Sequence, residues 1–120
     1  FAVEGFRSLL DQRVVDVIMP DVKYAGGLME MNHIAAAAGM TQTLVSPHNA
    51  TGPVATAATA QVASTLRNFL ILEYAWREVD WRADLLEPAE RIENGDLILP
   101  EGPGLGHKLN REVFESRLRA

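Results

Sequence analysis

The stretch Thr43–Asn49, TLVSPHN, joins a short apolar run to a proline, a histidine and an asparagine. Two further runs have the same character, VVDVIMP at Val14–Pro20 and NFLILE at Asn68–Glu73. Short runs rich in β-branched and other apolar residues are typical of buried strands, and proline interrupts regular strand structure. The sequence therefore predicts three strands, at residues 14–20, 43–47 and 68–73.

Helical segments alternate with these strands. Residues 1–12 repeat apolar side chains at helical spacing, residues 27–40 run between glycines, and residues 53–66 are rich in alanine. The resulting order, α-β-α-β-α-β, implies parallel strands joined by right-handed crossovers. Units of this length indicate an α/β fold, either a partial (β/α) TIM-type barrel or an open doubly wound sheet.

Composition excludes several classes of protein. The 120 residues include 48% hydrophobic and 22% charged residues, which suits a packed domain. A net charge of −5 argues against a nucleic-acid partner, and no apolar run approaches the roughly 20 residues that cross a membrane. The absence of cysteine excludes disulfides and thiolate metal sites. We expect a cytoplasmic protein.

Two features of the sequence indicate a piece of a larger fold. The first residue, Phe1, already belongs to a helical pattern. Three parallel strands alone would also leave two unpaired sheet edges, which parallel sheets normally avoid. We therefore expect the chain to be a fragment, with residues 1–75 supplying the last strands and helices of a barrel.

Residues 76–120 have a different pattern and are expected to form a separate C-terminal segment. Asn94-Gly95 lies between two β-compatible runs, which is a strong hairpin signal. Asn110 is a candidate N-cap for a final helix at 110–120. The acidic run ERIEN at 90–94 is expected to be a solvated face, and the glycine-rich GPGLG at 102–106 a structural loop.

Three ionisable residues follow the three predicted strands: Asp21, His48 and Glu73. They are 27 positions (48 minus 21) and 25 positions (73 minus 48) apart. The carboxyl ends of parallel strands form the active-site face of such folds, and neighbouring strands lie only about 4.8 Å apart. Asp21 is thus placed to fix the tautomer of His48 and aim its other nitrogen at a substrate, which Glu73 is placed to hydrogen-bond.

Each of these residues also has a purely structural interpretation. Asp21 is suited to capping a turn, His48 to a satisfied polar position at the rim, and Glu73 to a surface charge. Their occurrence at three consecutive strand ends favours catalysis. Weaker candidates are Gly26-Gly27, as backbone donors to an anion, and His33 and His107, which are expected to face solvent or pack.

The motifs DVIMPDVKYAGGLMEM, SPHN, NFLILEY and GPGLG resemble, in that order, the carboxyl-terminal part of the enolase superfamily in its mandelate racemase subgroup. This resemblance covers essentially the whole chain. It implies that Asp21 and His48 form an acid/base dyad and that Glu73 hydrogen-bonds the substrate carboxylate. It also implies that the C-terminal segment covers a separate amino-terminal capping domain.

The resemblance further implies a magnesium-dependent reaction on a small-molecule carboxylate, here a sugar acid. A base removes the proton α to the carboxylate, and loss of the β-hydroxyl then gives a 2-keto-3-deoxy acid. His48 is either the acid that protonates the departing hydroxyl or the base itself. The metal ligands are expected upstream of Phe1, so the fragment alone should be inactive, and the family is often homo-oligomeric.

Two alternatives to a sugar-acid dehydratase stay open. Reprotonation of the same intermediate would make the enzyme a racemase or epimerase acting α to a carboxylate. A non-catalytic fragment would instead carry the dyad as a vestige.

Overall fold

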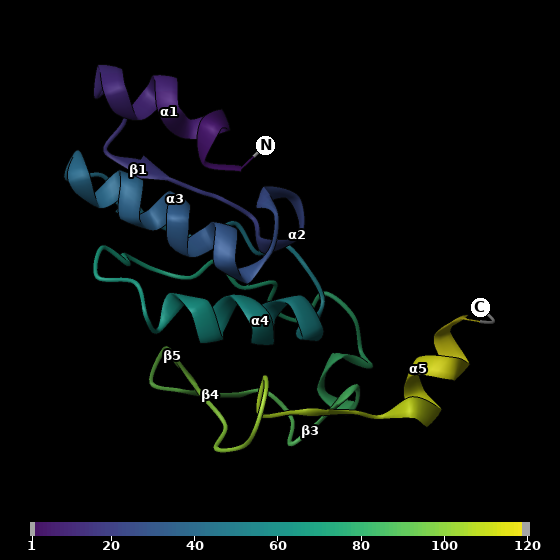
Figure 1. The fold of residues 1–120 in the computed structure, drawn as a ribbon. Coiled ribbons are helices and arrows are strands. Elements are labelled where there is room, and N and C mark those ends of the chain that lie inside the picture. The colour runs from purple at the N-terminus through teal and green to yellow at the C-terminus, as the bar shows by residue number, and fades with distance from the viewer. Residues whose placement is uncertain (1, 119–120) are drawn as a thin grey trace.

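Helices and short strands alternate along the first half of the chain in the computed structural model, which describes residues 2–118 (Figure 1). The elements are α1 (Ala2–Gln12), β1 (Val17–Ile18), α2 (Val22–Ala25), α3 (Leu28–Met40), β2 (Leu44–Val45), α4 (Pro53–Ala63), a 3₁₀ turn (Arg82–Asp84), β3 (Leu86–Glu87), β4 (Arg91–Glu93), β5 (Asp96–Ile98), β6 (Lys108–Leu109) and α5 (Arg111–Leu118). Within the described residues, no helix combines the length and apolar content needed to span a membrane.

The strands of the first half are parallel, as predicted, but shorter than predicted. β1 pairs with β2 over two residues each, in the register Val17 to Leu44. The third predicted strand is reduced to one parallel bridge, between Val45 and Phe69. A strand needs a hydrogen-bonded neighbour as well as a suitable sequence, and among residues 2–118 these segments pair only over short lengths. The predicted spans 14–20, 43–47 and 68–73 were therefore too long.

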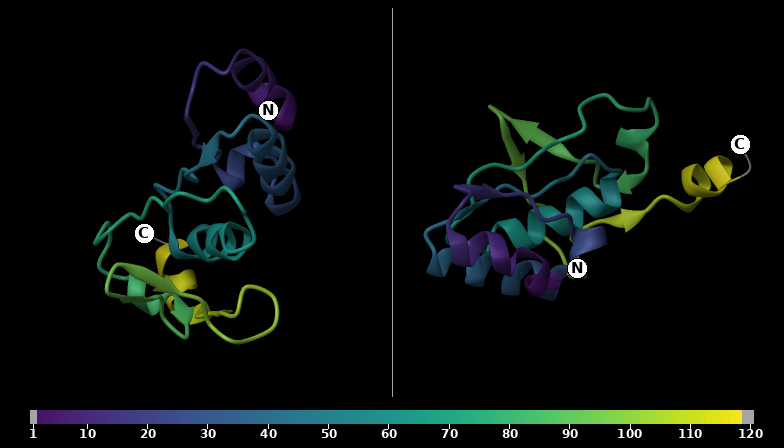
Figure 2. Two further views of the ribbon diagram at one scale, coloured as in Figure 1. Left: turned by 90° about the vertical axis from the view of Figure 1, so that its left-hand side faces the viewer. Right: turned by 90° about the horizontal axis from the view of Figure 1, so that it is seen from above.

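Helices α1, α3 and α4 lie side by side, and the strands run along one side of this layer (Figure 2). α3 is the central helix and contacts both of the others. Its residues Met31, Ile34 and Ala38 are fully buried and pack with Val45 of β2 in the main hydrophobic cluster. The resulting architecture, parallel strands covered by helices on one side, is that of an α/β fold.

The C-terminal segment forms the predicted hairpin and, as α5, the described part of the helix predicted at 110–120, of which residues 119 and 120 lie outside the described residues. β4 and β5 are antiparallel, and Asn94 and Gly95 between them have φ values of 53° and 93°. Two positive φ values are what a tight hairpin turn requires, and Asn-Gly meets that requirement. The side chain of Asn110 accepts a hydrogen bond from the backbone N–H of Val113 at 3.4 Å, as expected of an N-cap.

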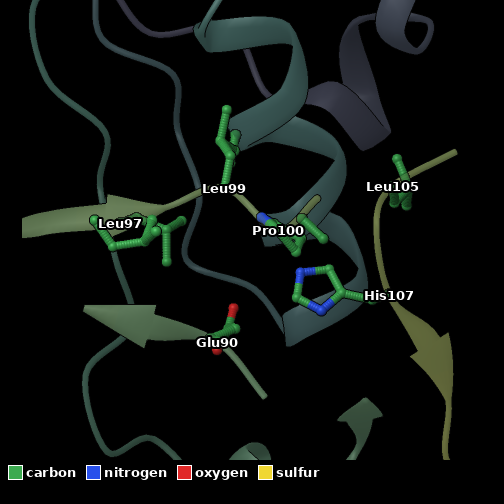
Figure 3. A pocket seen from close by; sticks show the side chains of 9 residues that line it. Glu90, Leu97, Leu99, Pro100, Leu105 and His107 are labelled. Carbon is green, nitrogen blue, oxygen red and sulfur yellow. The ribbon is translucent and has the colours of Figure 1, made fainter. Parts of the chain in front are cut away.

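The glycine-rich loop lies against α4. A side chain at Gly106, whose φ is +77°, would place its Cβ 2.5 Å from Cγ of Pro100, so the close approach of the loop to itself requires glycine. Figure 3 shows the small pocket that this loop encloses with α4 and β5, lined by Leu97, Leu99 and His107 among others. Its volume is about 10 Å³, which is room for one water and excludes a sugar acid.

Candidate functional site

Backbone pairing of β1 and β2 brings Asp21 and His48 together. The parallel hydrogen bonds continue past the strands: Ser46 N–H donates to the Ile18 carbonyl at 3.0 Å, and His48 N–H donates to the Pro20 carbonyl at 3.1 Å. His48 is thus fixed beside the residue that follows Pro20. The prediction that these two strand ends are neighbours is confirmed by this pairing.

The Asp21 carboxylate performs both functions that the sequence left open. Its Oδ1 accepts a hydrogen bond of 2.7 Å from Lys23 N–H and so caps α2. Its Oδ2 lies 2.9 Å from Nδ1 of His48. The turn cap and the contact with His48 are therefore compatible, because each uses a different oxygen, and the cap fixes the direction in which the second oxygen points.

The proton between these two groups belongs to the histidine. Burial opposes ionisation of Asp21, but the hydrogen bonds from His48 and from the Lys23 backbone outweigh it and hold the pKa of Asp21 below its usual value of 3.8. At neutral pH the carboxylate is therefore ionised and only accepts hydrogen bonds. Nδ1 of His48 must then carry the proton, which leaves Nε2 as the nitrogen that can exchange one with a ligand.

Glu73 completes the cluster. Its Oε2 lies 3.8 Å from Nε2 of His48 and accepts a hydrogen bond of 2.7 Å from the Asn49 backbone N–H. The side chains of His48 and Glu73 are 44% and 39% exposed, whereas that of Asp21 is 6% exposed. The three residues therefore lie together, with the orienting group buried and the other two open to solvent. Their catalytic roles stay predictions.

Asn49 was not singled out from the sequence, although it contacts Glu73 twice. Besides the backbone bond, its side-chain Nδ2 donates to the Glu73 carbonyl at 2.9 Å, and the residue is fully buried. A signal was present, because an asparagine directly after His48 precedes a turn of small residues. The local sequence cannot show that this side chain contacts a residue 24 positions later in the chain.

A buried ion pair in the C-terminal segment was also missed. Arg82 Nε and Nη2 donate to the two Glu90 oxygens at 2.8 and 3.0 Å, and the two side chains are 7% and 6% exposed. The prediction of a solvated acidic face was therefore wrong for Glu90. Burial works against the charged form of Arg82, but hydrogen bonds to Glu90 and Tyr74 prevail and raise its pKa above the usual value.

The remaining candidates do not join the site. His33 is exposed and lies 3.4 Å from Glu30 on the same helix, and His107 Nδ1 lies 2.6 Å from the Pro88 carbonyl. Gly26 and Gly27 both have positive φ, and Gly27 caps α3. Their geometry is that of a turn between α2 and α3.

The described residues do not fit a magnesium site. Between residues 2 and 118, no group of three or more acidic or histidine side chains is arranged to hold a metal ion. Magnesium requires oxygen ligands in octahedral geometry, and both oxygens of Asp21 are engaged in hydrogen bonds. The cluster of Asp21, His48 and Glu73 is therefore suited to moving a proton, not to holding a metal.

Curated relatives match nearly the whole chain. It is 40% identical to D-xylonate dehydratase of Haloferax volcanii over 114 residues, covering 95% of this chain and 28% of the relative. It is 38% identical to D-gluconate/D-galactonate dehydratase of Picrophilus torridus over 115 residues, covering 93% of this chain and 29% of the relative. The chain thus spans less than a third of the length of these sugar-acid dehydratases.

Solved structures agree with the fold. A Burkholderia xenovorans LB400 protein, assigned provisionally as an L-alanine-DL-glutamate epimerase and bound to magnesium and fumarate, is similar with a TM-score of 0.88 and 30% identity. The match covers 97% of this chain and 29% of that one.

The enolase C-terminal domain-like family model matches residues 1–113. The chain belongs to the enolase C-terminal domain-like family, which has a barrel-type fold, and it matches the carboxyl-terminal portion of its dehydratase relatives.

Proposed function

We propose that this chain is the C-terminal part of a sugar-acid dehydratase and contributes the last three βα units of its barrel. The observation that carries the proposal is the His48–Asp21 hydrogen bond of 2.9 Å, with Nε2 of the same ring directed to the half-exposed side next to Glu73. Sugar-acid dehydratases among the relatives at 38% and 40% identity supply the reaction class.

In the proposed reaction, a 2,3-dihydroxy acid loses water. The Cα–H bond breaks, the proton passes to a base, and the electron pair forms an enediolate with the carboxylate. The Cβ–O bond then breaks, the departing hydroxyl takes a proton and leaves as water, and the enol converts to the 2-keto-3-deoxy acid. His48 Nε2 either takes the α proton or gives a proton to the departing hydroxyl. The Asp21 carboxylate stabilises the imidazolium that exists whenever Nε2 carries a proton.

Glu73 is proposed to bind the substrate. Its Oε2 is already held by the Asn49 N–H, and the described residues make no hydrogen bond to its Oε1. An oxygen without a protein partner at a half-exposed position is available to a ligand. Since Glu73 and Nε2 of His48 lie 3.8 Å apart, both can contact the same small molecule.

The proposal that the reaction needs magnesium rests on relatives alone, because one protein of similar structure binds magnesium. The residues described here do not form its site, so its ligands would come from other parts of a longer protein. Without these ligands the isolated chain would be inactive. Residues 76–120 are further proposed to cover a capping domain. Homo-oligomerisation and a cytoplasmic location also stay predictions.

The test is the product formed by the longer protein that contains this chain. Incubation with a panel of five- and six-carbon sugar acids should give 2-keto-3-deoxy acids, measured as their semicarbazones. A product mixture that contains only epimers would favour the racemase or epimerase alternative, which the similarity to the Burkholderia protein supports. No conversion of any acid, with a folded and metal-loaded protein, would favour a vestigial dyad.

A further inference from the structure

A buried polar network connects the rim cluster (Asp21, His48 and Glu73) to the C-terminal segment, and it begins at Asn49. The backbone N–H of Asn49 holds the Glu73 carboxylate at 2.7 Å, and its Nδ2 holds the Glu73 carbonyl at 2.9 Å. Two bonds from one residue to both the side chain and the backbone of Glu73 restrict the position of its carboxylate. The position of Glu73 therefore depends on what holds Asn49.

Thr56 of α4 holds Asn49. Its hydroxyl oxygen accepts a hydrogen bond of 3.1 Å from Asn49 Nδ2 and lies 3.2 Å from the Gly52 carbonyl, to which it donates. The same oxygen accepts a bond of 2.9 Å from Nη2 of Arg82. A hydroxyl has one proton and two acceptor sites, so Thr56 uses its full capacity in these three contacts. The residue is fully buried, so water does not replace any of them.

Arg82 anchors the network. Its Nη1 donates to the Thr51 carbonyl at 2.8 Å, which fixes the backbone of the loop after His48. Glu90 neutralises its charge, and Tyr74 contributes both its ring face, 4.7 Å from the guanidinium carbon, and its hydroxyl. Glu90 Oε2 also accepts a hydrogen bond of 2.9 Å from the Tyr74 hydroxyl. Burying a charge is costly unless it is paired in this way.

We propose that Arg82, Thr56 and Asn49 are positioning residues that hold the Glu73 carboxylate beside His48. This inference rests on the proposed function for its kinetic consequence, because a displaced Glu73 matters to a rate only if Glu73 binds the substrate. Arg82 and Thr56 do not touch the rim cluster themselves. They act through Asn49, at a site whose productive geometry tolerates little displacement.

The experiment uses the longer protein and two matched threonines. Thr56→Val removes the hydroxyl that joins Asn49 to Arg82 and keeps the shape of the side chain. Thr59→Val is the control, because Thr59 is equally buried on α4, but its hydroxyl donates only to the Ala55 carbonyl of the same helix. Thr56→Ser is the conservative variant, which keeps the hydroxyl. Each is combined with Glu73→Gln in a double-mutant cycle measured on kcat/KM.

Thr56→Val should lower kcat/KM about tenfold or more, whereas Thr59→Val and Thr56→Ser should stay close to the parent protein. Added to Glu73→Gln, Thr56→Val should lower kcat/KM by a smaller factor than it does in the parent protein, since the carboxylate that it positions is gone. Equal losses in the two valine variants, or full additivity with Glu73→Gln, would overturn the proposal. Should Thr56→Val not fold, Thr56→Ala replaces it in the same cycle.

Failure of the proposed function has a different signature. A parent protein that dehydrates no sugar acid contradicts that function before any variant is compared. The cycle is then measured on the midpoint of thermal unfolding, where Thr56 and Glu73 should be coupled and Thr59 and Glu73 should not. Coupling limited to Thr56 upholds the network, and additivity in both pairs overturns it.

Discussion

Two clusters of ionisable side chains contact the loop of residues 48–51, and they differ in what surrounds their charges. The rim cluster, Asp21, His48 and Glu73, leaves two of its three side chains about 40% exposed. The buried cluster, Tyr74, Arg82 and Glu90, has its ion pair 7% and 6% exposed, and every buried side-chain nitrogen and oxygen of the described residues has a hydrogen-bond partner. The first can exchange partners with a ligand, and the second cannot without losing a buried bond.

The difference predicts that substitutions in the rim cluster affect activity with little change in stability, whereas those in the buried cluster lower stability and affect activity only through the position of Glu73. In the longer protein, His48→Asn should reduce turnover of the preferred sugar acid by at least about 10²-fold, because it removes the proton-exchanging nitrogen. The midpoint of thermal unfolding should change little, since water can replace a half-exposed ring. Full activity in this variant would remove His48 from the mechanism.

Glu90→Gln should lower the free energy of unfolding by about 3–5 kcal/mol, because the buried Arg82 charge loses its counter-ion. The matched control is Glu93→Gln, which breaks the exposed Arg91–Glu93 pair of 3.0 Å only three residues later. That change should stay within about 1 kcal/mol. Denaturant titration of both variants makes the measurement, and similar losses would mean that burial does not separate the two pairs.

Glu73→Gln should lower kcat/KM by about tenfold, less than His48→Asn, because an amide oxygen still accepts the Asn49 N–H bond and still contacts the substrate. Steady-state kinetics on the two variants side by side give the ratio. A loss equal to that of His48→Asn would show that the charge or proton of Glu73 takes part in the reaction itself.

Asp21 is the buried member of the rim cluster, and the smallest of the expected effects is the change in the unfolding midpoint of Asp21→Asn with pH. Its pKa is lowered in the folded protein, so the stability that its carboxylate contributes is fully present above its usual pKa of 3.8 and is lost as pH falls through the folded value. The unfolding midpoint of the parent should therefore exceed that of Asp21→Asn by a few degrees at pH 6. This difference should shrink at pH 3, and a constant difference would assign the effect to packing alone.

Sequence patterns predicted the features that depend on nearby residues or on strand pairing. Asn94-Gly95 predicted the hairpin because only certain residues accept two positive φ values, and the strand-end positions of Asp21, His48 and Glu73 predicted their meeting because parallel pairing aligns such ends. Strand length depends on hydrogen-bonded neighbours, so the predicted spans were too long. The Arg82–Glu90 pair joins residues in an irregular segment to α4, and no periodicity in the sequence encodes that contact.

The link between Arg82 and Thr56 also sets an order of events during synthesis. Proteins are made from the amino terminus, so Asp21, His48 and Thr56 leave the ribosome before Arg82 and Glu90. Until those later residues arrive, the Thr56 hydroxyl and the Thr51 carbonyl lack the guanidinium that holds them. A nascent chain that ends at residue 81 would contain all three rim residues, yet its loop of residues 48–51 would lack the bond from Arg82 to the Thr51 carbonyl.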